Sequence, residues 1–255
     1  MSRESVSRSA VETFRPWTVG ESIPPIESAL LPTLTHADLC RIGKDKRLQD
    51  WATLTCLREP WFWLVNLCST VDEHYVAKGL ATPYQRFPPL AYLQKAAQVL
   101  WQERYICCLK SRQVRWTWLV ACYLLGEALA QEGRLYLVQS KRAFDAVQVL
   151  RRQYGVWERM REAAPWYGPQ LEEQAFGVQG GHLRFANGSS IVAVPEGAHY
   201  VQSHTPTVWW ADEIQLQAEA EEAFYQALPA CEKIIIGGTA EPGWFCDVFL
   251  PDEKG

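Results

Sequence analysis

Three basic residues gather where a short apolar run passes into a helical pattern. The run YICCL, residues 105–109, is typical of a buried strand, and the helical pattern begins near Thr117. Lys110, Arg112 and Arg115 lie between the two. Positive charge is unfavourable at a helix N-terminus unless an anion binds there. Because a phosphate chain would resolve this conflict, the cluster predicts a phosphate-binding site.

The same segment departs from the usual phosphate-binding loop, G-x-x-x-x-G-K-[ST]. Thr117 occupies the Ser/Thr position, whose hydroxyl ligates Mg²⁺ in such loops. However, Trp116 replaces the lysine, Arg115 replaces the second glycine, and Lys110 replaces the first. On the pattern alone, a basic turn between a strand and a helix is the better interpretation, whereas the clustered cations favour a phosphate site.

Acidic and hydroxyl side chains follow two later apolar runs. VWWADE ends at Asp212 and Glu213, where an aspartate can hold Mg²⁺ and a glutamate can act as general base. An N-cap Asp beside a solvated Glu explains the pair equally well when it is taken alone. KIIIGGT brings Thr239 to another strand end, where a hydroxyl can sense a phosphate, although a plain exit into a turn is the alternative. Gly237 and Gly238 permit close approach of the backbone.

The elements that must position these residues alternate between short apolar runs and helical patterns. We predict helices at residues 117–131, 141–164 and 218–228, and a hairpin at 182–196 that turns at Asn187-Gly188. Strands are predicted at 105–109, 134–140, 207–213 and 233–239. This order predicts an α/β fold, a mostly parallel sheet with helices on both faces. Since functional sites gather at the carboxyl ends of such strands, the basic loop and the acidic pair are expected to lie together.

Along the chain, three regions differ in composition. Residues 1–35 are rich in Ser, Pro and Thr and predict a loosely ordered arm. Residues 36–84 form a helix-prone, Trp-rich block, and the prolines of TPYQRFPPL indicate a boundary near residue 85, with the core at 85–255.

The overall composition excludes several classes of protein. A net charge of -4 leaves no global basic footprint for nucleic acid, so DNA contacts require a local patch or a part outside this chain. The eight cysteines show no CxxC pair or metal spacing, which predicts a reducing compartment and no structural zinc. The sequence lacks the pattern of a signal peptide or a membrane span, so we expect a soluble intracellular protein without a membrane partner.

Taken in order, these motifs resemble the ATPase domain of the large subunit of a tailed-bacteriophage DNA-packaging terminase. LKSRQVRWTW is similar to the family's K-S-R-Q-x-G-x-[ST] loop, and FPPLAYLQKAAQ resembles its adenine-recognising Q motif. NGSSIVAVP with HTPTVWWADE resembles the N-G-S-x-I hairpin and the R-G-x-T-P-x-hydrophobic-DE segment. GTAEPGWFCDVF resembles the motif that couples hydrolysis to movement, and REPWFWLVNLCSTVDE is similar to the preceding helical segment. The resemblance covers roughly residues 57–249.

This resemblance implies a P-loop fold of the ASCE/RecA-like type that binds ATP and Mg²⁺. It implies catalytic roles for Glu213 as general base, Arg112 as a charge stabiliser near the γ-phosphate, and Thr239 as the coupling residue. It assigns the metal to Thr117 and Asp212, and adenine recognition to Gln94. The ATP contacts it implies along the loop are Lys110 as the phosphate-binding lysine, Ser111, Arg112, Gln113, Val114, Arg115, Trp116 and Thr117.

The implied activity is that of an ATP-hydrolysing motor that drives double-stranded DNA into a procapsid. Its partners would be the portal protein, the small terminase subunit and further copies in a ring, with a monomer as the alternative for the isolated domain. The implied location is the host cytoplasm, at the procapsid portal vertex, and not the finished virion. The family's C-terminal nuclease domain has no counterpart before the chain stops at FLPDEKG, so no nuclease activity is expected of these residues.

Two departures from the family pattern leave alternatives open. Arg115-Trp116 stands where a small residue and a variable one are usual, and Gln202 replaces an arginine that acts on the neighbouring subunit's ATP in some members. Arg112 in cis, Arg115 or Arg184 could supply the missing charge, or hydrolysis is slow. The alternative functions are a degenerate nucleotide-binding or structural module of the packaging machine and, less favoured because no second RecA-like domain is visible, a superfamily 2 helicase fragment.

Overall fold

The computed structural model describes residues 33–111 and 113–248. These residues belong to two compact units, one of residues 33–90 with 158–167 and one of residues 91–157 with 168–248. Helix α7 (Ala143–Ala163) contributes residues to both units. The arm expected at 1–35 lies almost wholly outside the described residues.

The first unit is built mainly from three helices, α2 (His36–Ile42), α3 (Lys46–Arg58) and α4 (Pro60–Leu67). Strands β1 (Ser69–Val71) and β2 (Tyr84–Arg86) follow these helices in the sequence and pair with each other antiparallel. A capping box between Thr35 and Asp38 begins α2, and the Asp45 side chain caps α3. Trp51 and Trp63 are each 1% exposed, so these tryptophans of the predicted helical block serve as core.

The second unit contains a seven-stranded sheet with the strand order β3-β9-β8-β4-β7-β6-β5. The five strands from β3 to β7 in that order run parallel, and β6 and β5 are antiparallel additions at one edge. This confirms the predicted α/β class. The strands are β3 (Tyr105–Leu109), β4 (Leu135–Ser140), β5 (Leu171–Gly177), β6 (Gly180–Phe185), β7 (Ser190–Pro195), β8 (Val208–Asp212) and β9 (Lys233–Gly238).

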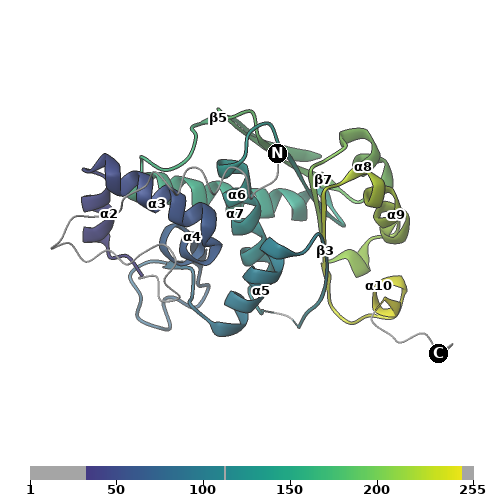
Figure 1. The fold of residues 1–255 in the computed structure, drawn as a ribbon. Helices are drawn as coiled ribbons and strands as arrows, with labels where there is room; N and C mark the ends of the chain where they lie inside the picture. The colour runs from purple at the N-terminus through teal and green to yellow at the C-terminus, as the bar shows by residue number, and fades with distance from the viewer. Residues whose placement is uncertain (1–32, 112, 249–255) are drawn as a thin grey trace. The chain divides into compact units, whose positions relative to one another are not determined.

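Helices cover both faces of this sheet, as predicted (Figure 1). On one face, the helices that follow β7, β8 and β9 pack against alternate strand residues such as Trp209, Ile234 and Ile236. Helix α6 lies on the other side and contacts β4 and β7. Trp209 and Trp210 are therefore both fully buried although they point to opposite faces. The remaining elements are α5 (Ala91–Gln102), α6 (Trp116–Ala130), α8 (Ala198–His204), η1 (Ile214–Leu216), α9 (Ala220–Ala230) and α10 (Trp244–Asp247).

The predicted hairpin is formed by β6 and β7 and turns at Asn187-Gly188. Gly188 has φ 79°, the left-handed conformation that glycine adopts without strain. The Asn187 amide donates hydrogen bonds to the carbonyls of Ala128 (2.9 Å) and Gln131 (2.7 Å), which fastens the turn to the end of α6. Strand β5 and helix α8 were not predicted, because β5 is largely exposed without apolar alternation and α8 is only seven residues long.

No helix in the described ranges is both long and apolar enough to cross a membrane. Among the same residues, no three or more His, Cys, Asp or Glu side chains are grouped so that they could hold a metal ion.

Candidate functional site

The candidate site residues identified in the sequence lie together at the carboxyl ends of neighbouring strands. Strands β3, β9 and β8 are neighbours, with Leu109 beside Gly238 and Asp212 beside Gly237. The backbone N–H of Lys110 extends this pairing by donating to the Gly238 carbonyl at 2.9 Å. The basic loop, the acidic pair and Thr239 therefore meet at the carboxyl ends of three adjacent strands.

Lys110, Asp212 and Thr117 form the centre of the site. The Thr117 hydroxyl donates a hydrogen bond of 2.8 Å to Asp212 Oδ2. The Lys110 ammonium lies 3.5 Å from Asp212 Oδ1, and the two side chains are only 13% and 8% exposed. This is an ion pair without hydrogen-bond geometry, because Oδ1 has no hydrogen-bond partner among the described residues. A buried carboxylate that is only partly paired is costly, and a cation or further donor would satisfy it.

The loop between β3 and α6 adopts a backbone that non-glycine residues rarely use. Gln113 and Arg115 have φ of 63° and 58°, which costs about 1 kcal/mol or more for each residue. Arg115 is the N-cap of α6 but makes no side-chain cap hydrogen bond, and the first turn contains no acidic residue. The outward-pointing N–H groups of this turn are thus left for another acceptor. Arg112, the proposed charge stabiliser, lies outside the described residues.

Trp116 points into the protein and fills space beneath the loop. Its side chain is 7% exposed, and its indole Nε1 has no hydrogen-bond partner among the described residues. A Cβ on Gly237 would lie 2.5 Å from this nitrogen, so only glycine fits there. The close approach that the sequence suggested for Gly237 thus occurs against an indole. The residue at the usual lysine position is therefore a packing residue between α6 and β9.

Glu213 begins η1 in a strained conformation, with φ 52° and ψ 43°, and is half-buried. Arg142, which follows the neighbouring strand β4, was missed by the sequence interpretation. Its guanidinium donates to both carboxylate oxygens of Asp145, at 2.8 and 3.1 Å. The hydrogen bond and charge of Asp145, together with the charge of Glu213, raise the pKa of Arg142. Its position just after a strand end was the available signal.

Thr239 is held by a residue that the sequence interpretation also missed. The Gln215 amide donates to the Thr239 hydroxyl at 3.0 Å, and that hydroxyl donates to Glu241 Oε1 at 3.5 Å. Gln215 stands only two positions after Glu213, and this spacing was the available signal.

Other predicted residues lie further from this centre. Gln94 is exposed on α5, and Gln202 is exposed on α8. Two residues before Gln94, the Tyr92 hydroxyl donates to the Val114 carbonyl at 3.5 Å, which connects α5 to the loop. Arg184 lies on β6, where it pairs with Glu173 at 2.6 Å, so the structure does not bring it to the cluster. In the loop itself, Ser111 and Gln113 are exposed.

The two cysteines of β3 are expected to react slowly with alkylating reagents. Burial raises the pKa of Cys107 to about 12, with a smaller contribution from Cys108. Burial also raises the pKa of Cys108, to which Lys110 and Asp212 contribute in opposite directions. Because the thiolate is the reactive form, both thiols should be modified more slowly near neutral pH than the exposed Cys40. Peptide mass spectrometry after timed iodoacetamide treatment measures this, and equal rates for Cys108 and Cys40 would contradict the described burial.

The residues present match what a magnesium nucleotide requires. The Thr117 hydroxyl and the under-paired Asp212 carboxylate are hard oxygen ligands of the kind that Mg²⁺ prefers. Lys110 supplies a positive charge beside the uncapped start of α6. Glu213 adds a half-buried carboxylate at the same edge. Together these groups can hold phosphates and a divalent cation, and can accept a proton from water.

No protein-family model and no curated protein sequence matches the chain. Among solved structures, a variant of the large terminase ATPase domain of Thermus phage P74-26 is similar at 16% identity and a TM-score of 0.47, over 71% of this chain and 74% of that one. The same domain in another structure gives 14% identity and a TM-score of 0.43 over the same shares. The large terminase of a thermophilic bacteriophage in complex with ADP gives 16% identity and a TM-score of 0.43, over 63% of this chain and 42% of that one. These three structures, to which the chain is similar, are of phage large terminases or their ATPase domains.

Proposed function

We propose that the chain binds ATP and Mg²⁺ at the Lys110–Asp212–Thr117 cluster and hydrolyses the nucleotide. The observation that carries the proposal is this cluster, which combines a cation, a carboxylate and a hydroxyl at the start of α6. The hydrogen bond between Thr117 and Asp212 joins residues 95 positions apart in the chain. A basic turn or an isolated N-cap aspartate does not require such an arrangement.

Each residue has a role that its position supports. Lys110 binds the phosphate oxygens, which draws its ammonium from Asp212 toward the nucleotide. Thr117 and Asp212 hold the metal, which neutralises phosphate charge when bound. Glu213 orients a water molecule and accepts its proton. Arg142 follows the neighbouring strand β4, where Asp145 holds its guanidinium.

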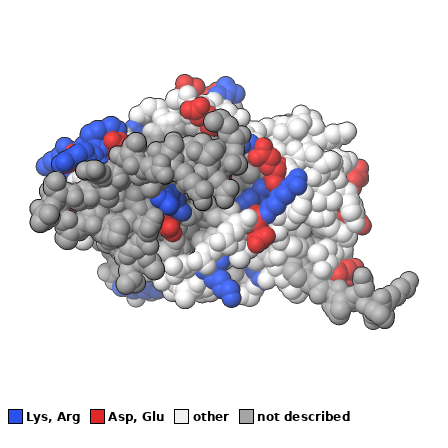
Figure 2. All heavy atoms as spheres, viewed as in Figure 1, with Lys and Arg blue, Asp and Glu red and all other residues white. Residues whose placement is uncertain are grey.

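The wider role we propose is that of the motor domain of a DNA-packaging terminase large subunit. The ordered series of motifs from Gln94 to Thr239 supports it. The proposed partners are double-stranded DNA, the portal protein, the small terminase subunit and further copies of the chain. The proposed location is the portal vertex in the host cytoplasm. On the face in Figure 2, acidic and basic side chains lie next to one another at several places, so we expect DNA contacts from a local patch.

A degenerate nucleotide-binding module is the second candidate, and Trp116 and Arg115 are the observations that favour it. Trp116 packs under the loop, and Arg115 begins α6 in a left-handed conformation. The intact contacts of Lys110 and Thr117 with Asp212 favour an active site, because they leave the charges needed for hydrolysis in place.

The proposal is tested by titrating the purified chain with ATP and Mg²⁺ and by measuring phosphate release with and without double-stranded DNA. We expect saturable binding that weakens when EDTA removes the metal, and phosphate release that rises with DNA. Absence of binding and of turnover, with DNA and the portal protein both present, would contradict the proposal. Binding without turnover would favour the degenerate module.

A further inference from the structure

The segments that follow Asp212 and Gly237 leave the sheet next to each other. Strands β8 and β9 run parallel, with Asp212 beside Gly237 in the register. Glu213 and Gln215 belong to the first segment, and Thr239 belongs to the second. A side chain from one segment can therefore contact the other segment and respond to its position.

Gln215 is fixed relative to Glu213 by the short helix η1. The Leu216 N–H donates to the Glu213 carbonyl at 3.0 Å, which closes the turn around Gln215. The Gln217 side chain donates to the Asp212 carbonyl at 3.1 Å and holds the same turn against the strand end. A change in the backbone at Glu213, which already has φ 52°, must therefore move Gln215.

The Gln215 amide reaches across to the Thr239 segment and is only half satisfied there. Its Nε2 donates to Thr239 Oγ1, whereas its Oε1 is buried without a hydrogen-bond partner among the described residues. A Cβ on Gly238 would lie 2.2 Å from this Oε1, so the glycine allows the amide to lie against the strand. An unpaired buried acceptor raises the free energy of the present arrangement. Loss of the Gln215–Thr239 hydrogen bond therefore costs little free energy if the Gln215 amide gains another partner.

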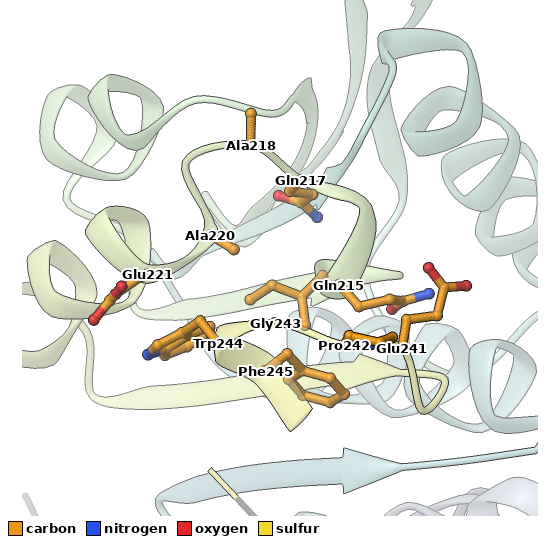
Figure 3. Close-up of a pocket in the computed structure, with 11 residues that line it drawn as sticks. Gln215, Gln217, Ala218, Ala220, Glu221, Glu241, Pro242, Gly243, Trp244 and Phe245 are labelled. Atoms are coloured by element: carbon orange, nitrogen blue, oxygen red, sulfur yellow. The ribbon is translucent and has the colours of Figure 1, made fainter. Parts of the chain in front are cut away.

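The space beside this contact allows the second segment to move. A pocket of about 250 Å³ lies between the η1–α9 segment and the start of α10. Figure 3 shows Gln215 and Glu241 at one end of this pocket and Trp244 at the other. Because close-packed interiors resist displacement, an open pocket lined by Glu241, two residues after Thr239, makes a shift of this loop easier.

We propose that Gln215 is a positioning residue that links the conformation of Glu213 to that of Thr239 during nucleotide turnover. The inference rests on the proposed function. The hydrogen bond from Gln215 to Thr239 holds the Thr239 loop in place while Glu213 keeps its present backbone. When the backbone at Glu213 changes, the bond breaks and the Thr239 loop is released.

A double-mutant cycle on the whole chain tests the link. We expect Gln215→Ala and Thr239→Val each to lower kcat about tenfold, within the range that mutations in coupling networks produce. The ATP Kd and KM should stay within about twofold, because neither side chain holds the phosphates. The double variant should be no slower than either single variant, since both remove the same bond. Gln226→Ala, which removes a half-buried amide on α9 that donates to Glu222, is the matched control and should leave kcat unchanged.

Amide hydrogen exchange of the nucleotide-free chain gives a readout that needs no activity. Exchange across residues 239–243 should accelerate in Gln215→Ala and stay unchanged in Gln226→Ala. Full kcat in Gln215→Ala, while Glu213→Gln loses turnover, would overturn the link but leave the proposed function standing. The same conclusion would follow if the loss of kcat in the double variant equalled the product of the two single losses. Absence of turnover in the wild-type chain would contradict the proposed function, and amide exchange would still decide whether Gln215 holds the Thr239 loop.

Discussion

Replacing Lys110 by methionine is expected to weaken ATP binding about 100-fold, the loss that follows when one partner of a buried charge pair is removed. Methionine keeps the length of the apolar stem and removes only the charge. The Lys110 side chain is 13% exposed and its ammonium lies 3.5 Å from Asp212 Oδ1, so water replaces the lost charge poorly. Titration with ATP and Mg²⁺ measures the loss.

The matched control for Lys110→Met is Lys141→Met, because Lys141 also follows the carboxyl end of a sheet strand, β4. It makes no contact with Asp212 among the interactions described here, and its replacement should change the Kd by less than about threefold. Thermal unfolding of both variants shows whether either has lost its fold. Equal affinities for the wild-type chain and a folded Lys110→Met variant would contradict the assignment of the phosphate-binding lysine.

Replacing Trp116 by lysine is expected to destabilise the protein by about 3–5 kcal/mol, the cost of an uncompensated buried charge. The change restores the usual phosphate-loop sequence at that position. However, the side chain lies against Gly237 and is 7% exposed, so the lysine would place a charge under the loop and leave part of the indole's volume empty. Urea unfolding measures the difference in the free energy of unfolding.

Trp116→Phe is the matched control, because it keeps an apolar ring at the same position and should cost less than Trp116→Lys. A second arm combines Trp116→Lys with Lys110→Met. We expect no recovery of ATP binding, since the side chain at position 116 is buried against Gly237 of β9. A double variant that is stable and binds ATP as the wild type does would show that position 116 can still serve the phosphates.

The fold was largely predictable because each strand of the sheet core carries a continuous apolar run. Residues 105–109, 134–140, 207–213 and 233–239 were identified in this way, and their order predicted a parallel sheet. Strand β5 was missed because its residues are mostly exposed and it is held by pairing with β6. Helix α8 was missed because seven residues give no helical periodicity.

The site was predictable only as far as strand ends are. Lys110, Asp212 and Thr117 each stand next to a strand end or a helix start, and the topology then brings them together. The packing of Trp116 on Gly237 could not be predicted, because it depends on β9 being the neighbour of β3. Gln215 was missed because its partner, Thr239, is 24 positions away in the sequence. Arg142 was missed because its bond to Asp145 depends on a local turn.

The role of Glu213 as general base is tested by the rate of ATP hydrolysis by the wild-type chain and by Glu213→Gln, at saturating ATP and Mg²⁺. A general base contributes about 100- to 10,000-fold to a rate, so the variant should lose nearly all turnover while its ATP Kd stays the same. Glu221→Gln, on the first turn of α9, is the matched control and should turn over normally. A folded Glu213→Gln variant that hydrolyses ATP at the wild-type rate would show that Glu213 is not the general base.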